Sequence, residues 1–423
     1  MYLGVGKAVI TPPLGTPLAG FGHRDHGAES VRDDLEVRAL WLQEEAADDA
    51  LCLVAADIIG FDDALTGRLR AEMQARYALP PERLLLAASH THSGPATCEK
   101  TVGVGQVVPE VVAMVLQRIL DAVAEARSEL RPVTLRAGRG LCAGYAVNRR
   151  LVREDGVHFV PNLDGPRDDT VTVLAYHDTD DDSIRAVLFH FTCHPTVMGD
   201  YAITGDYPGV ARRHIENELG NGAVAAFLPG CFGNIRANTA YLGGQSFRPG
   251  LPPDLAAFGS ALGSEVVRVA RGQTLPVTPR LGGKSRTITL PLKGHPDRET
   301  LERLAANGTP LEKEWSAGLL AAPFTTTRPF NLHRFDLADK VTLLTMGGET
   351  SCEYGLAIKQ KRPDAFLIPM GYTNGLIGYI CLARQIAEGG YEADTSSVYF
   401  GLPSPFAPEI EPRIYAAIDD LLA

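Results

Sequence analysis

The chain has 423 residues, of which 45% are hydrophobic and 22% are charged, as in an ordinary globular protein with a substantial core. Its formal net charge of −11 argues against a nucleic-acid partner or an anionic membrane surface. The 43 glycines and 29 prolines predict many tight turns and long loops, and exclude a simple helical bundle.

The seven cysteines are scattered along the chain without a CxxC pair, so we expect neither a disulfide framework nor a cysteine zinc cluster. The N-terminus lacks a basic start followed by an apolar stretch. No apolar run approaches the ~20 residues that a membrane span needs. We therefore expect a cytoplasmic protein without stable membrane insertion.

Short or alternating apolar runs predict strands, and apolar residues at helical spacing predict helices. The predicted strands are, in chain order, residues 2–10, 35–43, 51–59, 84–88, 133–137, 170–176, 184–192, 223–228, 285–292, 340–346 and 365–370. The predicted helices are residues 63–77, 107–126, 210–219, 254–271, 297–306, 354–361 and 409–422. An acidic hairpin is expected between residues 43 and 51, and residues 152–169 and 315–333 carry no clear pattern.

Strands that alternate with helices but also form hairpins indicate an α/β fold with mixed β-sheets flanked by helices. A dinucleotide-binding fold is not expected, because no predicted strand runs into a GxGxxG sequence. We interpret residues 1–423 as a single domain, with residues 272–340 as a peripheral insertion or cover.

The predicted strand Leu84–Ala88 runs into Ser-His-Thr-His and then into the turn residues Ser-Gly-Pro. Residues i and i+2 of a strand point to the same face, so His90 and His92 should emerge side by side. Two imidazoles suit two metal bonds, or one metal bond and one role in proton transfer or oxyanion binding. Alternatively, the two histidines are ordinary polar residues at the end of a strand.

Two further strands end in a metal-capable side chain next to glycine or proline, namely His194 and Glu349, and Tyr379 follows a fourth strand. Two imidazoles and one carboxylate form a common ligand set for catalytic zinc. The spacing alone leaves open whether these strand ends converge.

Other polar residues have structural interpretations. Asp57 is expected to cap the helix that follows it rather than face a pocket, and Asp206 fits the N-cap of helix 210–219. His190 is interpreted as a core histidine. The turn Pro229–Asn234 follows a buried strand, and its small residues could let the backbone N–H groups of Gly233 and Asn234 face a substrate.

The chain resembles the catalytic domain of the neutral/alkaline (non-lysosomal) ceramidases, zinc amidases that split the N-acyl bond of ceramide. The motifs that carry the resemblance are Ala88-Ser-His-Thr-His-Ser-Gly-Pro95, Asn148-Arg149, His194-Pro-Thr, Gly205-Asp206, Gly348-Glu349, Tyr379 and Tyr391-Glu-Ala. The resemblance implies one Zn²⁺ bound by His90, His194, Glu349 and Tyr379. It also implies that the scissile amide is contacted by His92, Arg149 and Tyr391.

One departure from the family bears on mechanism. Family members carry a serine in a Gly-Asp-Val-Ser-Pro-Asn turn, whereas this chain has the shorter Gly230-Cys-Phe-Gly-Asn. The place of the serine falls to Phe232 or Gly233, and neither carries a hydroxyl. Cys231 is either a substitute nucleophile or, as we favour, a buried structural thiol.

The sequence therefore predicts a zinc-dependent hydrolase in which metal-activated water cleaves the amide bond of a small or amphiphilic acyl-amide. A metal-dependent esterase or lactonase with the same site is an alternative, and so is a metal-binding pseudoenzyme without catalysis.

Overall fold

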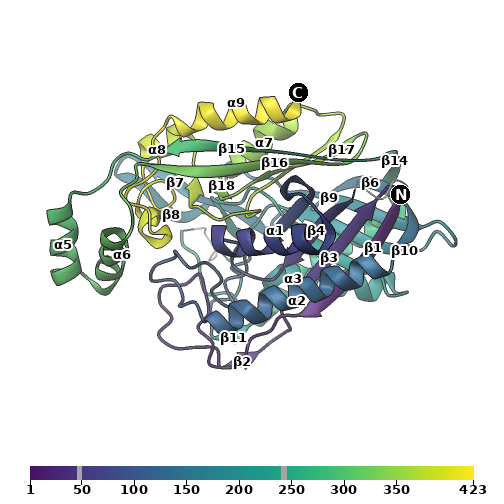
Figure 1. Ribbon diagram of the computed structural model, residues 1–423, viewed down its shortest axis with the longest axis horizontal. Coiled ribbons are helices and arrows are strands. Elements are labelled where there is room, and N and C mark those ends of the chain that lie inside the picture. The colour runs from purple at the N-terminus through teal and green to yellow at the C-terminus, as the bar shows by residue number, and fades with distance from the viewer. Residues whose placement is uncertain (45–49, 240–244) are drawn as a thin grey trace.

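Two β-sheets packed face to face, with helices on both outer surfaces, form the computed structural model of the protein (Figure 1). The structure describes residues 1–44, 50–239 and 245–423. The expected acidic hairpin falls on residues 45–49, which lie outside the described residues.

The larger sheet has nine mixed strands. Its order is β12 (Val224–Pro229), β10 (Ile184–Phe191), β9 (Thr170–Asp178), β6 (Arg131–Leu141), β1 (Tyr2–Val9), β3 (Glu36–Gln43), β4 (Leu51–Ala56) and β5 (Leu84–Ala88), and β14 (Thr274–Val277) also pairs with β6. The second sheet consists of β15 (Pro279–Pro291), β16 (Thr327–Ala338), β17 (Val341–Met346) and β19 (Phe366–Met370). Small sheets join β2 (Ser30–Val31) to β11 (Ala202–Ile203), β7 (Ala146–Arg153) to β8 (Gly156–Asn162) and β13 (Ile235–Ala237), and β18 (Glu349–Thr350) to β20 (Tyr379–Ile380).

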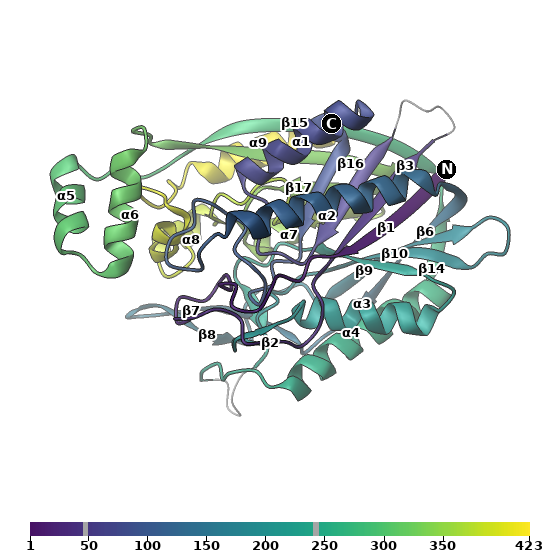
Figure 2. The same ribbon diagram turned by 60° about the horizontal axis from the view of Figure 1, so that its bottom comes forward.

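Side-chain alternation along the strands explains this layering. In β3, Val37, Ala39 and Trp41 contact the helical side, whereas Leu40 and Leu42 contact the second sheet. This is the period of two that a strand buried on both faces requires. Helices α3 and α4 lie side by side on one face of the large sheet (Figure 2).

The helices are α1 (Asp63–Tyr77), α2 (Pro109–Ser128), α3 (Asp206–Leu219), α4 (Pro252–Gly272), α5 (Arg298–Asn307), α6 (Pro310–Ala321), α7 (Cys352–Gln360), α8 (Ala383–Glu388) and α9 (Ile410–Leu422). None of the described helices is long and apolar enough to cross a membrane. All seven cysteines are unpaired and buried.

The segment 272–340, expected as a peripheral cover, contributes strands to both large sheets through β14, β15 and β16. Within this segment, the hairpin of α5 and α6 projects from the body at one end of the molecule (Figure 1). The stretch 315–333 was unpatterned in sequence but forms the end of α6 and the start of β16. Residues 321–329 are largely exposed, so the stretch shows no regular alternation of apolar residues before Phe330.

Two expected helix caps are wrong. The helix α1 is capped by Asp62, whose carboxylate accepts from Leu65 N–H at 2.8 Å. Asp57 instead accepts from Arg212 Nη1 at 2.6 Å, inside a buried ion-pair group. Asp206 is the first residue of α3 and has a φ of 53°. Its carboxylate accepts from the backbone of Met198, a tertiary contact that the local sequence does not reveal.

Candidate metal centre

The carboxyl ends of strands from both sheets meet at one edge of the molecule. His90 and His92 follow β5, His194 follows β10, and Glu349 lies just beyond β17 on β18. Each of β5, β10 and β17 pairs in parallel with a neighbouring strand. Binding sites commonly form outside the carboxyl ends of parallel strands, and this convergence is what the spacing in the sequence left open.

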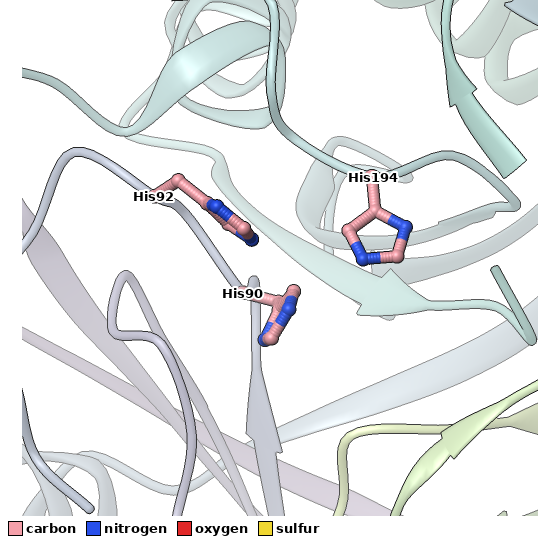
Figure 3. A group of neighbouring side chains, drawn as sticks. All are labelled: His90, His92 and His194. Atoms are coloured by element: carbon pink, nitrogen blue, oxygen red, sulfur yellow. The ribbon is translucent and has the colours of Figure 1, made fainter. Parts of the chain in front are cut away.

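The three histidine rings point toward one another (Figure 3), and their ligand nitrogens lie within 4.8 Å of one another. The strand ends at Ala88 as expected, so the alternation of a strand does not extend to His90 and His92. His90 instead adopts a left-handed backbone with a φ of 66°. A non-glycine residue in this conformation is strained, and such strain is common where a side chain is held for function.

Backbone carbonyls fix the orientation of two of these rings. His90 Nδ1 donates to Ile59 O at 2.5 Å. His194 Nδ1 donates to Phe232 O at 2.6 Å and to Ile235 O at 2.8 Å. A neutral imidazole with its proton on Nδ1 presents the lone pair of Nε2, which is how metal-binding histidines are held.

The Glu349 carboxylate faces these two nitrogens. Its Oε2 lies 3.0 Å from His194 Nε2, and its Oε1 lies 3.5 Å from His90 Nε2. An unprotonated nitrogen and an ionised carboxylate repel each other at this distance unless a cation or a proton lies between them. The donor set of two imidazoles and one carboxylate therefore fits a divalent metal ion such as zinc.

The electrostatics of the site favour the protonation states that a metal requires. Burial, followed by the charge of Arg149, lowers the pKa of His194 to about 4. Burial also lowers the pKa of His92 well below its ordinary value. Burial alone would raise the pKa of Glu349, but His90 and His194 reverse this effect and hold it well below its usual range. A neutral His194 beside an ionised Glu349 is ready to bind a metal.

His92 differs from the other two histidines. Among the residues that the structure describes, neither of its ring nitrogens has a hydrogen-bond partner, although both are buried. It therefore completes a three-histidine ligand set or, equally, presents a nitrogen to a substrate. Ligand geometry supports both His90–His92–His194 and His90–His194–Glu349 as sets.

Arg149 lies beside the centre in a fully paired environment. Its Nε donates to Glu392 at 2.7 Å, and its Nη2 donates to Gly233 O at 2.6 Å and to Tyr379 Oη at 2.9 Å. Its guanidinium carbon also lies 5.8 Å from the centre of the Tyr391 ring. Burial would lower the pKa of Arg149, but Tyr379 and Glu392 raise it by more than burial lowers it. The guanidinium is therefore a permanent cation.

Tyr379 was expected as a fourth ligand. It pairs with Glu349 between β20 and β18, which places both residues at the same level of the cavity. Its hydroxyl accepts from Arg149, and burial raises its pKa well above the ordinary value. The structure thus brings Tyr379 to the centre with its hydroxyl facing the arginine.

The turn at Gly233 and Asn234 makes several contacts within the protein. The side chain of Asn234 accepts from Cys352 N–H at 2.8 Å and donates to Glu353 at 2.8 Å. The carbonyl of Gly233 accepts from Arg149. These groups hold the start of α7 and the arginine, and the Gly233 N–H donates to Thr350 O at 2.8 Å. A substrate contact of this turn stays a prediction.

No hydroxyl replaces the family serine in this turn. Phe232 is fully buried and stacks on Tyr372 at 4.0 Å. A Cβ atom on Gly233 would lie 2.5 Å from the carbonyl oxygen of Glu349. Burial raises the pKa of the Cys231 thiol far above neutrality, which disfavours the thiolate that a nucleophile needs.

A small cavity of about 40 Å³ is lined by His90, His92, Glu349 and Tyr379. Its lining combines the metal-capable side chains with mainly apolar residues: Ala19, Gly20, Ile59, Thr101, Val104, Leu376, Tyr391, Tyr399 and Phe400. An apolar wall around a few convergent polar groups is typical of a site for small or amphiphilic molecules.

Sequence reasoning missed two groups that support the site. Glu392 was visible only as the neighbour of Tyr391, yet it pairs with both Arg149 and Arg150. The loop that contains Gly20 and Arg24 packs on His92, and Arg24 Nη1 donates to His92 O at 2.5 Å. The signal for a buried acid that the sequence offered was the adjacent pair Arg149 and Arg150, which lies in a strand.

Comparisons with known proteins agree with this arrangement. Residues 1–246 match the family model described as "Neutral/alkaline non-lysosomal ceramidase, N-terminal". The chain is 25% identical to the neutral ceramidase of Pseudomonas aeruginosa over 246 residues, which cover 56% of this chain and 37% of that protein. The match thus spans little more than a third of the length of the curated relative.

Solved structures extend the likeness of the fold to nearly the whole chain. The crystal structure of neutral ceramidase from Pseudomonas aeruginosa superposes with a TM-score of 0.78 at 19% identity, covering 99% of this chain and 73% of that one. A structure described as ceramidase complexed with C2 gives a TM-score of 0.77 at 20% identity, with 99% and 74% covered. Because both superpositions cover 99% of this chain, the likeness of the fold extends beyond residue 246 to the part that contributes Glu349, Tyr379 and Tyr391.

Proposed function

Because the chain belongs to the neutral/alkaline non-lysosomal ceramidase family, we propose that it is a zinc-dependent hydrolase that cleaves the N-acyl bond of a small or amphiphilic amide. The observation that carries the proposal is the pair of Nε2 atoms, on His90 and His194, that face an ionised Glu349 across 3.5 and 3.0 Å. The likeness to a neutral ceramidase supports an N-acyl amide as the bond that is cleaved.

In this proposal His90, His194 and Glu349 hold the metal, with Tyr379 beside them as a weaker ligand. When bound, zinc supplies Lewis-acid activation of a water molecule and of the substrate carbonyl. The side chains around it bind and orient the amide.

The protein's own residues have distinct roles. His92 is neutral, and neither ring nitrogen has a hydrogen-bond partner among the described residues, so it donates to the carbonyl oxygen or carries a proton to the leaving amine. Arg149 stays charged and, with Tyr391, stabilises negative charge that develops on the oxygen. Water is the nucleophile, because neither Phe232 nor Gly233 offers a hydroxyl.

The proposal separates ligands from substrate-binding groups, and this separation is testable. In purified protein, His90→Ala and His194→Ala should lose stoichiometric zinc, as measured by elemental analysis, together with hydrolysis of an N-acyl amide. His92→Ala should retain zinc and lose at least about 100-fold in kcat. Wild-type protein without stoichiometric zinc, or a His90→Ala variant with full activity, would refute the assignment.

A further inference from the structure

Arg236 lies next to the metal centre but takes no part in it. It is the middle residue of β13, and it forms an isolated parallel bridge with His194. The preceding residue, Ile235, provides the carbonyl that accepts from His194 Nδ1 at 2.8 Å. The position of Arg236 is therefore tied to that of a metal-binding ring.

Two aromatic side chains flank this arginine. Its guanidinium carbon lies 4.7 Å from the centre of the Phe247 ring and 6.0 Å from that of Phe159. Phe159 is 41% exposed, and its ring lies 5.6 Å from Tyr391, which lines the metal cavity. Arg236, Phe159 and Phe247, here named the Arg236 group, thus form a surface that continues outward from the cavity.

Arg236 lacks a counter-charge, in contrast to its neighbours. Arg149 and Arg150 share Glu392, and Arg150 also pairs with Glu388. In the described part of the chain no carboxylate pairs with Arg236, and its Nε is buried without a hydrogen-bond partner.

Burial, followed by the nearby charge of Arg149, lowers the pKa of Arg236 to about 10. Cys193 and Asp206 oppose this effect without reversing it, and the Asp206 carboxylate accepts from the backbone of Met198 and Tyr207. Arg236 is half-buried, and a cation partly removed from water without a carboxylate partner carries a free-energy cost that an anionic ligand would offset.

We propose that Arg236 binds an oxyanion at one end of the substrate, so that the preferred substrates are N-acyl amino acids or N-acyl aminosulfonates. The aromatic faces of Phe159 and Phe247 accommodate the planar guanidinium and the carbon atoms next to the anion. The inference rests on the proposed function for the identity of the cleaved bond, but the charge preference can be measured by binding alone.

The test compares three compounds with one acyl chain: N-lauroylglycine, N-lauroyltaurine and the neutral N-lauroylethanolamine. For the zinc-loaded protein, kcat/KM and the calorimetric Kd should each favour the two anionic compounds by about tenfold. The taurine arm shows whether the site takes any oxyanion or only a carboxylate. In Arg236→Gln the ratio of anionic to neutral compound should fall to near one, and Arg236→Lys should retain part of it.

Arg268→Gln is the matched control, because it removes the same charge from a surface pair with Glu265 and should keep the ratio. Equal kcat/KM and Kd for anionic and neutral compounds would overturn the inference while leaving the hydrolase intact. A preference that survives in Arg236→Gln would also overturn it, since the anion would then bind elsewhere, for example at zinc. If none of the three compounds is cleaved, the proposed function fails, and the Kd ratios still decide whether Arg236 binds an anion.

Discussion

The Nε atom of Arg149 and the Oε1 atom of Glu392 lie 2.7 Å apart, and only 5% and 1% of the two side chains are exposed. The second carboxylate oxygen of Glu392 accepts from Arg150 at 3.0 Å. One buried acid therefore fixes an arginine that faces the metal centre and its sequence neighbour, which faces away. This pairing aligns the Arg149 Nη2 atom with the hydroxyl of Tyr379.

Replacement of Glu392 should affect catalysis through the arginine. In Glu392→Gln the cation of Arg149 loses its counter-charge, and the loss of one partner from a buried pair costs about 3–5 kcal/mol. We expect kcat on an N-acyl amide to fall between about 10-fold and 100-fold at full zinc occupancy, since the guanidinium is no longer held. Glu388→Gln is the control, because it weakens the pairs with Arg150 and with the exposed Arg384 but leaves the pair of Arg149 and Glu392 in place. An equal loss of kcat in both variants would contradict the role of Glu392.

Gly20 should be required for the position of His92. Its φ is 90°, and a Cβ atom there would lie 2.4 Å from His92 Nδ1. Gly20→Ala should lower kcat while zinc content remains stoichiometric, because His90 and His194 are held by other carbonyls. Gly15→Ala controls for backbone strain, since Gly15 has a φ of 83° with no atom within 4 Å of the added carbon. Similar kcat values for the two variants would rule out a steric effect on His92.

A serine restored at Gly233 should damage the site rather than repair it. Its Cβ atom would approach the backbone carbonyl oxygen of Glu349 to 2.5 Å, and backbone cannot move away cheaply. We expect Gly233→Ser to lower Tm and zinc affinity, measured by chelator competition. Gly272→Ser, at a position with no atom within 4 Å, should change neither. A Gly233→Ser protein with higher kcat and unchanged Tm would show that the turn accepts the hydroxyl.

Acid should destabilise the protein through His333. This buried ring accepts from Arg70 Nη2 at 3.1 Å, and burial, followed by the Arg70 charge, lowers its pKa to about 3. Below its unfolded pKa of about 6.5 only the unfolded chain binds the proton, so this contribution is complete above pH 6.5 and is lost as pH falls toward 3.

The expected loss is about 1.4 kcal/mol per pH unit in the free energy of unfolding. Between pH 7 and pH 5 the stability difference between wild type and His333→Gln should therefore shrink by about 2 kcal/mol in urea titrations. His190, also buried with a pKa lowered to about 3, remains in both proteins and cancels in the comparison. A difference that is constant with pH would mean that His333 is already charged in the folded protein.

Much of the architecture could be predicted from local pattern. The helix Asp63–Tyr77 and the strand Leu84–Ala88 have the bounds that their apolar spacing indicated. The mixed α/β class is confirmed as well. The helix buries one face at helical spacing, and the strand is buried throughout, which its continuous apolar run indicated. The stretch 315–333 could not be assigned, because residues 321–329 are largely exposed and no alternation of apolar residues begins before Phe330.

The sequence by itself determined which side chains can do chemistry: imidazoles after two strands, a carboxylate after a third, and the family motifs around them. Only the tertiary structure decided how they are used. The carbonyls of Ile59, Phe232 and Ile235, distant in the chain from the rings they orient, set the tautomers of His90 and His194. The environment of a charge likewise depends on what lies near it in space, so Arg149 gains Glu392 as its partner while no carboxylate of the described residues pairs with Arg236.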